Sequence, residues 1–149
     1  MNKTQHYAEF VADLKLEQNT IKVFIKTLQK EQHSLIEGNI EDLDFLASEK
    51  EKIAEQLTNF SEQRNQYLAS QELSTNTEGM RKLLANHAPH TEINLIWNES
   101  LQLIKIAHQL SQTNGTIITT RLQYSQRALA ALQCAAGATS LYGPKGQAF

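Results

Sequence analysis

Apolar residues recur at seven-residue intervals along the early part of the chain. The repeat runs through Leu14, Ile21, Leu28 and Leu35, and further apolar residues fill the alternate steps of three or four. This spacing is typical of one face of a long α-helix. We therefore predict a helix at residues 3–37, about 50 Å long at a rise of 1.5 Å per residue.

A glycine separates this helix from a second one. Gly38 can adopt the left-handed conformation that ends a helix, because it has no Cβ atom. Asn39 can cap the next helix, and Asp42 lies in its first turn, where a negative charge complements the helix dipole. The connection is so short that the second helix, predicted at residues 40–69, must fold back on the first as an antiparallel hairpin.

Two cations interrupt the apolar face of the second helix. Its spacing of three and four residues is complete only if Lys50 and Arg64 count as seam positions. One interpretation is that their aliphatic stems cover the seam while their charged ends reach water. The other is that the hairpin places Lys50 near Glu31. The same register brings Arg64 near Asp13 or Glu17, and such charged layers fix the register of two helices with little net gain in stability.

The remaining sequence predicts a short helix, a third long helix and a tail. The polar residues 70–79 end the hairpin, and a short helical piece follows at residues 77–86 before Pro89. A wide apolar face then predicts a helix at residues 91–136. Residues 137–149 lose this periodicity, and their apolar side chains are candidates for contact with another molecule. The fold class is therefore all-α, a single domain at residues 1–149 built as an antiparallel bundle or coiled coil of three long helices.

An Asn-Gly pair lies inside the last predicted helix. Asn114-Gly115 would be a strong hairpin signal between strands of alternating polarity, but the residues before it lack that alternation. The helical spacing continues through the pair, so we predict an unbroken helix that accepts a cost of about 1 kcal/mol for an interior glycine. Gly115 then marks either a close approach of a neighbouring backbone or partner, or a tolerated kink.

Composition and charge exclude several classes of function. The chain has 149 residues, 40% of them hydrophobic, which suffices for one buried core. Its fourteen basic and sixteen acidic residues are spread along the sequence without a basic stripe, so we expect no nucleic-acid partner. The polar start and the lack of a long apolar run predict neither a signal peptide nor stable membrane insertion. With Cys134 as the single cysteine, these features favour a cytoplasmic protein.

Candidate chemistry is sparse. Phosphate-binding glycine loops, nucleophile elbows and zinc-protease motifs are absent from the sequence. His87 and His90 lie close together, but Pro89 places them in a loop without an evident third ligand. None of the five histidines follows a Glu by three positions, as a di-iron bundle requires. We therefore predict no metal, no cofactor and no catalytic residues, and so no enzyme.

Three segments together resemble a known family. They are the hairpin EQHSLIEGNIEDLDFLASEKEKIAEQLTNFSEQR, the helical segment TNGTIITTRLQYSQRAL and, about twenty-five residues after its Asn-Gly pair, the motif LYGPKGQ. With these segments the chain is similar to the FlgN family of flagellar export chaperones. The resemblance implies a cytosolic chaperone that binds the disordered C-terminal segments of hook-filament junction proteins, prevents their premature assembly and delivers them to the export gate.

The resemblance also implies site residues. Family members recognise their client through the C-terminal third, and the corresponding positions here are Asn114, Gly115, Ile117, Ile118, Leu122 and Leu129. The tyrosine of the LYG motif contacts the cytosolic domain of the export gate protein in that family, which corresponds to Tyr142. Lys50 and Arg64 remain structural residues of the seam.

Two other functions stay open. The wide apolar face of the last helix also suits a structural coiled-coil or oligomerisation protein that pairs with itself, which leaves a homodimer as a further partner. A metal-dependent helical-bundle enzyme is the third alternative. Light scattering with and without a partner peptide tests the self-pairing coiled-coil protein, and elemental analysis tests the metal-dependent enzyme.

Overall fold

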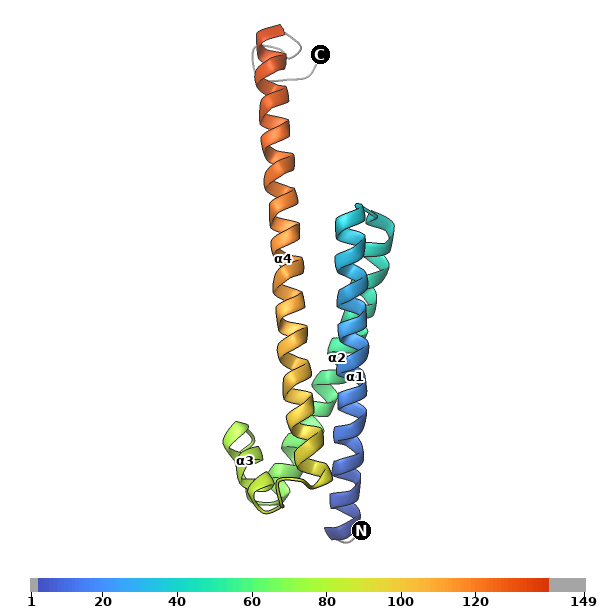
Figure 1. Cartoon of the computed structure of the whole chain (residues 1–149), viewed down its shortest axis with the longest axis vertical. Helices are drawn as coiled ribbons and strands as arrows, with labels where there is room; N and C mark the ends of the chain where they lie inside the picture. Colours follow the sequence, from blue (N-terminus) through green and yellow to red (C-terminus); the bar gives the residue numbers. More distant parts are fainter. Residues whose placement is uncertain (1–2, 140–149) are drawn as a thin grey trace.

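The computed structural model describes residues 3–139, and every regular element in that range is a helix (Figure 1). The helices are α1 (Lys3–Glu37), α2 (Ile40–Ser70), α3 (Thr77–Ala85) and α4 (Glu92–Thr139). The all-α prediction is confirmed. Each helix end lies within three residues of the prediction, and the largest difference is at α4, which continues to Thr139. The rest of the predicted tail, residues 140–149, lies outside the described residues.

The first helix is the centre of the molecule. Both α2 and α4 pack extensively on α1, whereas α2 and α4 contact each other little. The hairpin makes α2 antiparallel to α1, and α4 runs beside α1 in the same direction (Figure 1). Two hydrogen bonds show the parallel direction. The Gln18 side chain donates to the backbone carbonyl of Ile96. Further along both helices, the Asn114 side chain donates to the backbone carbonyl of Leu28.

The turn between α1 and α2 forms as the sequence predicted. Gly38 has φ +72°, the left-handed conformation that residues with a Cβ rarely adopt. Asn39 caps α2, and its side-chain oxygen accepts from the backbone N–H of Asp42 at 3.5 Å. Arg121 of α4 also reaches this turn, where its Nη2 donates to the carbonyl oxygen of Ile36 at 2.6 Å. A cation at this place complements the C-terminal end of α1.

The largest apolar cluster lies at the other end of the molecule, where all four helices meet. Asn76 caps α3 by accepting from the backbone N–H of Gly79 at 3.0 Å. The short helix then places Met80 and Leu83 against α1 and the start of α4. The buried members of the cluster are Phe10, Val11, Leu14, Leu68, Met80, Leu83, Ile93 and Ile96. This cluster anchors α4 next to the N-terminal half of α1.

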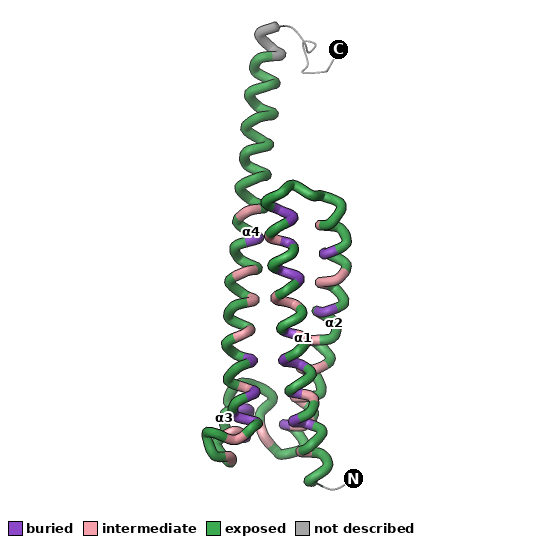
Figure 2. The backbone as a smooth tube through the Cα atoms, turned by 45° about the vertical axis from the view of Figure 1, so that its right-hand side comes forward, coloured by how far each residue is buried: buried purple, intermediate pink, exposed green. Residues whose placement is uncertain are grey.

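The last helix is continuous through Asn114 and Gly115, as predicted, and extends well past the hairpin turn (Figure 2). At Gly115 no atom would lie within 4 Å of an added Cβ, apart from the neighbouring residues of the helix itself. Hence no described part of this chain requires the glycine by close approach. Within residues 3–139, no helix is both long and apolar enough to span a membrane.

The two glycines predict opposite stability changes. We expect Gly38→Ala to lower the free energy of unfolding by about 1–2 kcal/mol, because alanine is strained at positive φ. Gly115→Ala should raise it by about 0.5–1 kcal/mol, because alanine is the better helix former and the space is open. Urea denaturation measures both changes, and an equal effect of the two substitutions would contradict this account of the turn.

Candidate protein-binding site

A buried carboxylate connects the three long helices. Glu31 of α1 is only 8% exposed. Its Oε2 accepts from Lys50 Nζ of α2 at 2.8 Å, and its Oε1 accepts from Asn114 Nδ2 of α4 at 2.8 Å. The same amide nitrogen donates to the carbonyl oxygen of Leu28 at 2.9 Å. Charge-assisted hydrogen bonds of this kind are stronger than neutral ones, so this layer fixes α2 and α4 relative to α1.

A second polar layer lies nearer the N-terminus of α1. Glu17 is 7% exposed and accepts from Arg64 Nη1 of α2 at 2.7 and 2.5 Å. The Arg64 guanidinium also lies over the ring of Trp97 in α4, with Cζ 5.1 Å from the ring centroid, a cation–π contact. Next to it, Gln18 Nε2 donates to the carbonyl oxygen of Ile96 at 3.3 Å. This layer therefore also spans three helices.

Both cations thus pair with carboxylates of α1, as the second interpretation of the sequence predicted. The ends of Lys50 and Arg64 do not simply reach water. Glu17 and Glu31 are two heptads apart on α1, and the cations are two heptads apart on α2, so both ion pairs belong to one antiparallel register. A slip of either helix by one turn would leave buried charges unpaired, which is costly.

Asn114, one of the client-binding residues that the family resemblance implies, lies inside the molecule. It is 1% exposed and packs against α1, so its side chain is not available to a client in this conformation. Its Oδ1 atom is buried and has no hydrogen-bond partner among the described residues. In this conformation its amide nitrogen holds α4 on α1, because a hydrogen-bonding side chain on the α1 side of α4 is used within the molecule.

Gly115, the next residue, lies on a different side of α4. It belongs to a row of exposed residues at heptad spacing, which we call the exposed stripe. The large side chains of the stripe are 40–57% exposed, and none is covered by the described part of the chain. Its members are Leu101, Ile104, Gly115, Ile118, Leu122, Leu129 and Leu132, and the exposed polar residues His108, Ser111 and Ser125 occupy the remaining positions of the same spacing.

The C-terminal part of the stripe stands clear of the hairpin. Arg121, at the level of the α1–α2 turn, makes the last hydrogen bond that we find between α4 and the other described helices. Residues 122–134, which we call the projecting segment, are all exposed, and Figure 2 shows this part of α4 rising beyond the hairpin. The segment is about 20 Å long at 1.5 Å per residue. Exposed apolar rows of this kind are candidate interaction surfaces.

The structure thus separates the predicted client-binding residues. Gly115, Ile118, Leu122 and Leu129 share the exposed stripe, whereas Ile117 is half-buried. Sequence reasoning missed three members of the stripe, although their heptad spacing from Ile118 was a usable signal. They are Leu101, Ile104 and Leu132. The predicted gate residue, Tyr142, lies outside the described residues.

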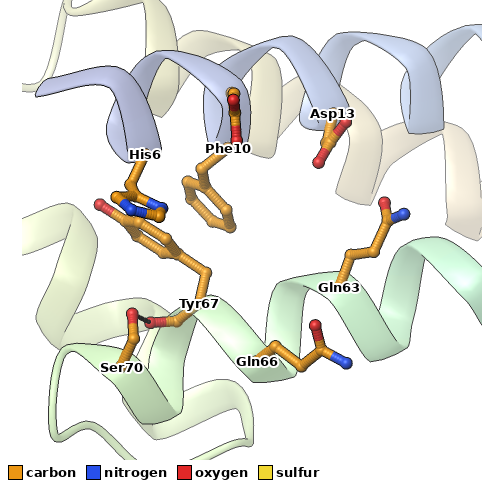
Figure 3. Close-up of a pocket in the computed structure, with 8 residues that line it drawn as sticks. His6, Phe10, Asp13, Gln63, Gln66, Tyr67 and Ser70 are labelled. Carbon is orange, nitrogen blue, oxygen red and sulfur yellow. Dashed lines mark hydrogen bonds between the residues drawn. The ribbon is translucent and has the colours of Figure 1, made fainter. Parts of the chain in front are cut away.

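A separate cleft lies between α1 and α2, near the N-terminus (Figure 3). It has a volume of about 270 Å³, and its aromatic wall is formed by Phe10 stacked on Tyr67, with ring centroids 4.1 Å apart. Burial and the nearby Glu9 carboxylate raise the pKa of Asp13 above its ordinary value, and burial raises that of Tyr67. Only α1 and α2 line this cleft, so it is not part of the exposed stripe.

No metal-binding arrangement is found among residues 3–139. In this part of the chain, no three His, Cys, Asp or Glu side chains form a group suited to hold an ion. His87, one of the two histidines singled out in the sequence, stacks its ring on Tyr7 at 5.3 Å between centroids. Its ring therefore takes part in packing between the α3–α4 connection and α1.

These observations define an elongated helical protein with an uncovered apolar stripe on its last helix, as in proteins that bind other polypeptides. The family comparison gives a more specific answer. A family model described as "FlgN protein" matches residues 1–148, so the chain belongs to the FlgN family. Searches of curated proteins and of solved structures found no match. Family membership supports a general role as a flagellar export chaperone, and this is a chaperone family rather than a known enzyme family.

The polar layer around Glu31 leads to a stability prediction. We expect Asn114→Ala to lower the free energy of unfolding by about 1–3 kcal/mol, because Glu31 loses a buried hydrogen-bond donor. Urea denaturation measures the change. Asn98→Ala, at an exposed position of the same helix, is the matched control and should change stability by less than about 0.5 kcal/mol. Similar effects of both substitutions would show that the amide of Asn114 does not hold α4 in place.

Proposed function

We propose that this protein is a cytoplasmic chaperone of flagellar type III export. Its clients are the hook-filament junction proteins, and it binds their disordered C-terminal segments along the exposed stripe of α4. It thereby prevents their premature assembly and delivers them to the export gate. The observation that carries this proposal is an apolar heptad row that no described helix of the chain covers.

The geometry of the stripe suits a helical partner. A segment with apolar residues at steps of three and four can lay them along a row of the same spacing, as amphipathic helices do in grooves. Gly115 supports this arrangement, because it offers a flat place with no atom of another described helix within 4 Å of its Cβ position. The backbone of a bound segment can approach α4 closely there.

The proposed client becomes ordered only when it binds. A disordered segment loses conformational entropy as it becomes helical, so affinity is lower than the buried area alone suggests. This suits a carrier that must release its client at the gate. The part of the stripe beyond Arg121 is accessible from more directions than the part beside the hairpin, so binding and release need no rearrangement of the α1–α2 hairpin.

We expect the double substitution Ile118→Glu and Leu122→Glu to weaken client binding at least about tenfold, since it places carboxylates on the apolar row. Titration calorimetry with the C-terminal segment of a junction protein measures the affinity. Circular dichroism should show almost unchanged helicity, because both side chains are about half exposed.

Leu16→Glu on α1 is the matched control, since Leu16 is 54% exposed and Leu122 is 57% exposed. Client affinity should be unaffected by it. If the double variant binds as well as the original protein, the stripe is not the client site. If light scattering shows a stable assembly that ignores added client, the alternative role as a self-pairing coiled-coil protein replaces the proposal.

The tail supplies a separate prediction. We propose that Tyr142 contacts the cytosolic domain of the export gate protein, as the family resemblance implies. Tyr142→Ala should then weaken binding to that domain while client affinity changes by less than about twofold, or 0.4 kcal/mol. Binding assays with the isolated gate domain and with the client segment measure the two effects. Loss of client affinity instead would assign the tail a different role.

A further inference from the structure

The charges of this chain are divided between its two parts. All sixteen Asp and Glu residues lie within residues 1–99, and the last of them is Glu99. Residues 100–149 contain four basic residues, Lys105, Arg121, Arg127 and Lys145, and no acidic one. The impression from the sequence that the charges are spread along the chain is therefore wrong. The acidic part forms the hairpin and α3, and the basic part begins where α4 has left the apolar cluster.

This division coincides with the exposed stripe. From Leu101 to Leu132 the stripe runs along a stretch of α4 without a carboxylate. Lys105, Arg121 and Arg127 are exposed on this stretch. At the base of α4, Glu92 pairs with Lys15 and Glu99 accepts from Gln18, and further along the helix the buried Glu31 of α1 accepts from Asn114. A partner that lies along the stripe therefore meets Lys105 and Arg121 at the edges of the row and no described acidic side chain of this stretch, whereas Arg127 lies on the opposite side of α4.

We propose that the exposed stripe binds an amphipathic helical segment that carries Asp and Glu along the edges of its apolar face. This inference rests on the proposed function and specifies the chemistry of the bound segment. Apolar residues supply the contact area, and the acidic edges face Lys105 and Arg121, which lie next to Ile104 and Leu122 at the two edges of the row. A segment with basic edges meets like charges on α4, so the same apolar face binds less well.

The same charge division disfavours binding at the wrong place. The hairpin also exposes large apolar side chains, such as Ile40 and Phe45, which are 73% and 65% exposed. Glu41, Asp42 and Asp44 surround them in the sequence. An acidic segment is repelled there and attracted to α4. Discrimination between two apolar surfaces by charge is a common source of specificity.

Two synthetic peptides test the proposal. Both have leucines at the a and d positions of three heptads, and the edge positions are Glu in one and Lys in the other. Fluorescence anisotropy with the full chain gives the affinities. We expect the Glu peptide to bind about fivefold more tightly at low salt, since exposed ion pairs are individually weak. The preference should vanish near 1 M salt, where the screening length is about 3 Å.

Charge-reversal variants localise the effect. The double substitution Lys105→Glu and Arg121→Glu should abolish the preference for the Glu peptide, because these two residues are the described charges at the edges of the row. Lys52→Glu on α2 is the matched control, since its side chain is also strongly exposed, at 68%, and it should leave the preference unchanged. Circular dichroism verifies that both variants remain helical.

The outcomes separate the two proposals. If the peptides bind equally, or the Lys peptide binds better, the acidic partner is refuted while the stripe remains a docking site. If neither peptide binds and light scattering shows self-association, a second copy of the chain occupies the stripe, and both the acidic partner and the proposed function fail.

Discussion

The hydrogen bonds of one carboxylate determine how the long helices fit together. Glu31 is buried, so its charge must be compensated, and its two oxygens accept from Lys50 of α2 and Asn114 of α4. Both partners also have a fixed direction of approach. Lys50 reaches Glu31 in the antiparallel register that the turn at Gly38 permits, and Asn114 reaches it with α4 running parallel to α1. The second layer, around Glu17, lies two heptads away. Both layers therefore require the same register of the helices.

The central position of α1 explains why α4 keeps an uncovered side. Because α2 and α4 both pack on α1 and contact each other little, each of them buries only one face. In addition, α4 is longer than α1 and α2. Arg121 reaches the carbonyl of Ile36 at the hairpin turn, and α4 continues past that point. An apolar row that runs beside the hairpin thus continues onto a part of the helix that no other described helix contacts. The proposed binding surface is a direct result of this mismatch.

Much of the fold was predictable from the sequence. Heptad spacing located the long helices, Gly38 and Asn39 located the turn, and the charged seam positions were predictable because antiparallel pairing fixes which α1 residues face them. The directions of Asn114 and Gly115 were not predictable. Neighbouring residues on a helix point about 100° apart, and the apolar face of α4 is wide enough to contain both directions. Only the packing of α1 shows that the amide points inward and the glycine outward. The role of Arg121 was hidden for the same reason, since its partner is a backbone carbonyl distant in sequence.

The projecting segment has a thermodynamic consequence. An isolated helix of similar length is only marginally stable in water, because each end lacks hydrogen-bond partners and nucleation is unfavourable. Residues 122–134 escape this limit by continuing a helix already nucleated below Arg121. Their helicity thus depends on the packed part of α4. A substitution that loosens Asn114 or Arg121 from α1 would therefore lower the helicity of the segment, although it lies outside the segment. A ligand that lies along the segment would stabilise its helical conformation directly, so occupancy and helix order would rise together.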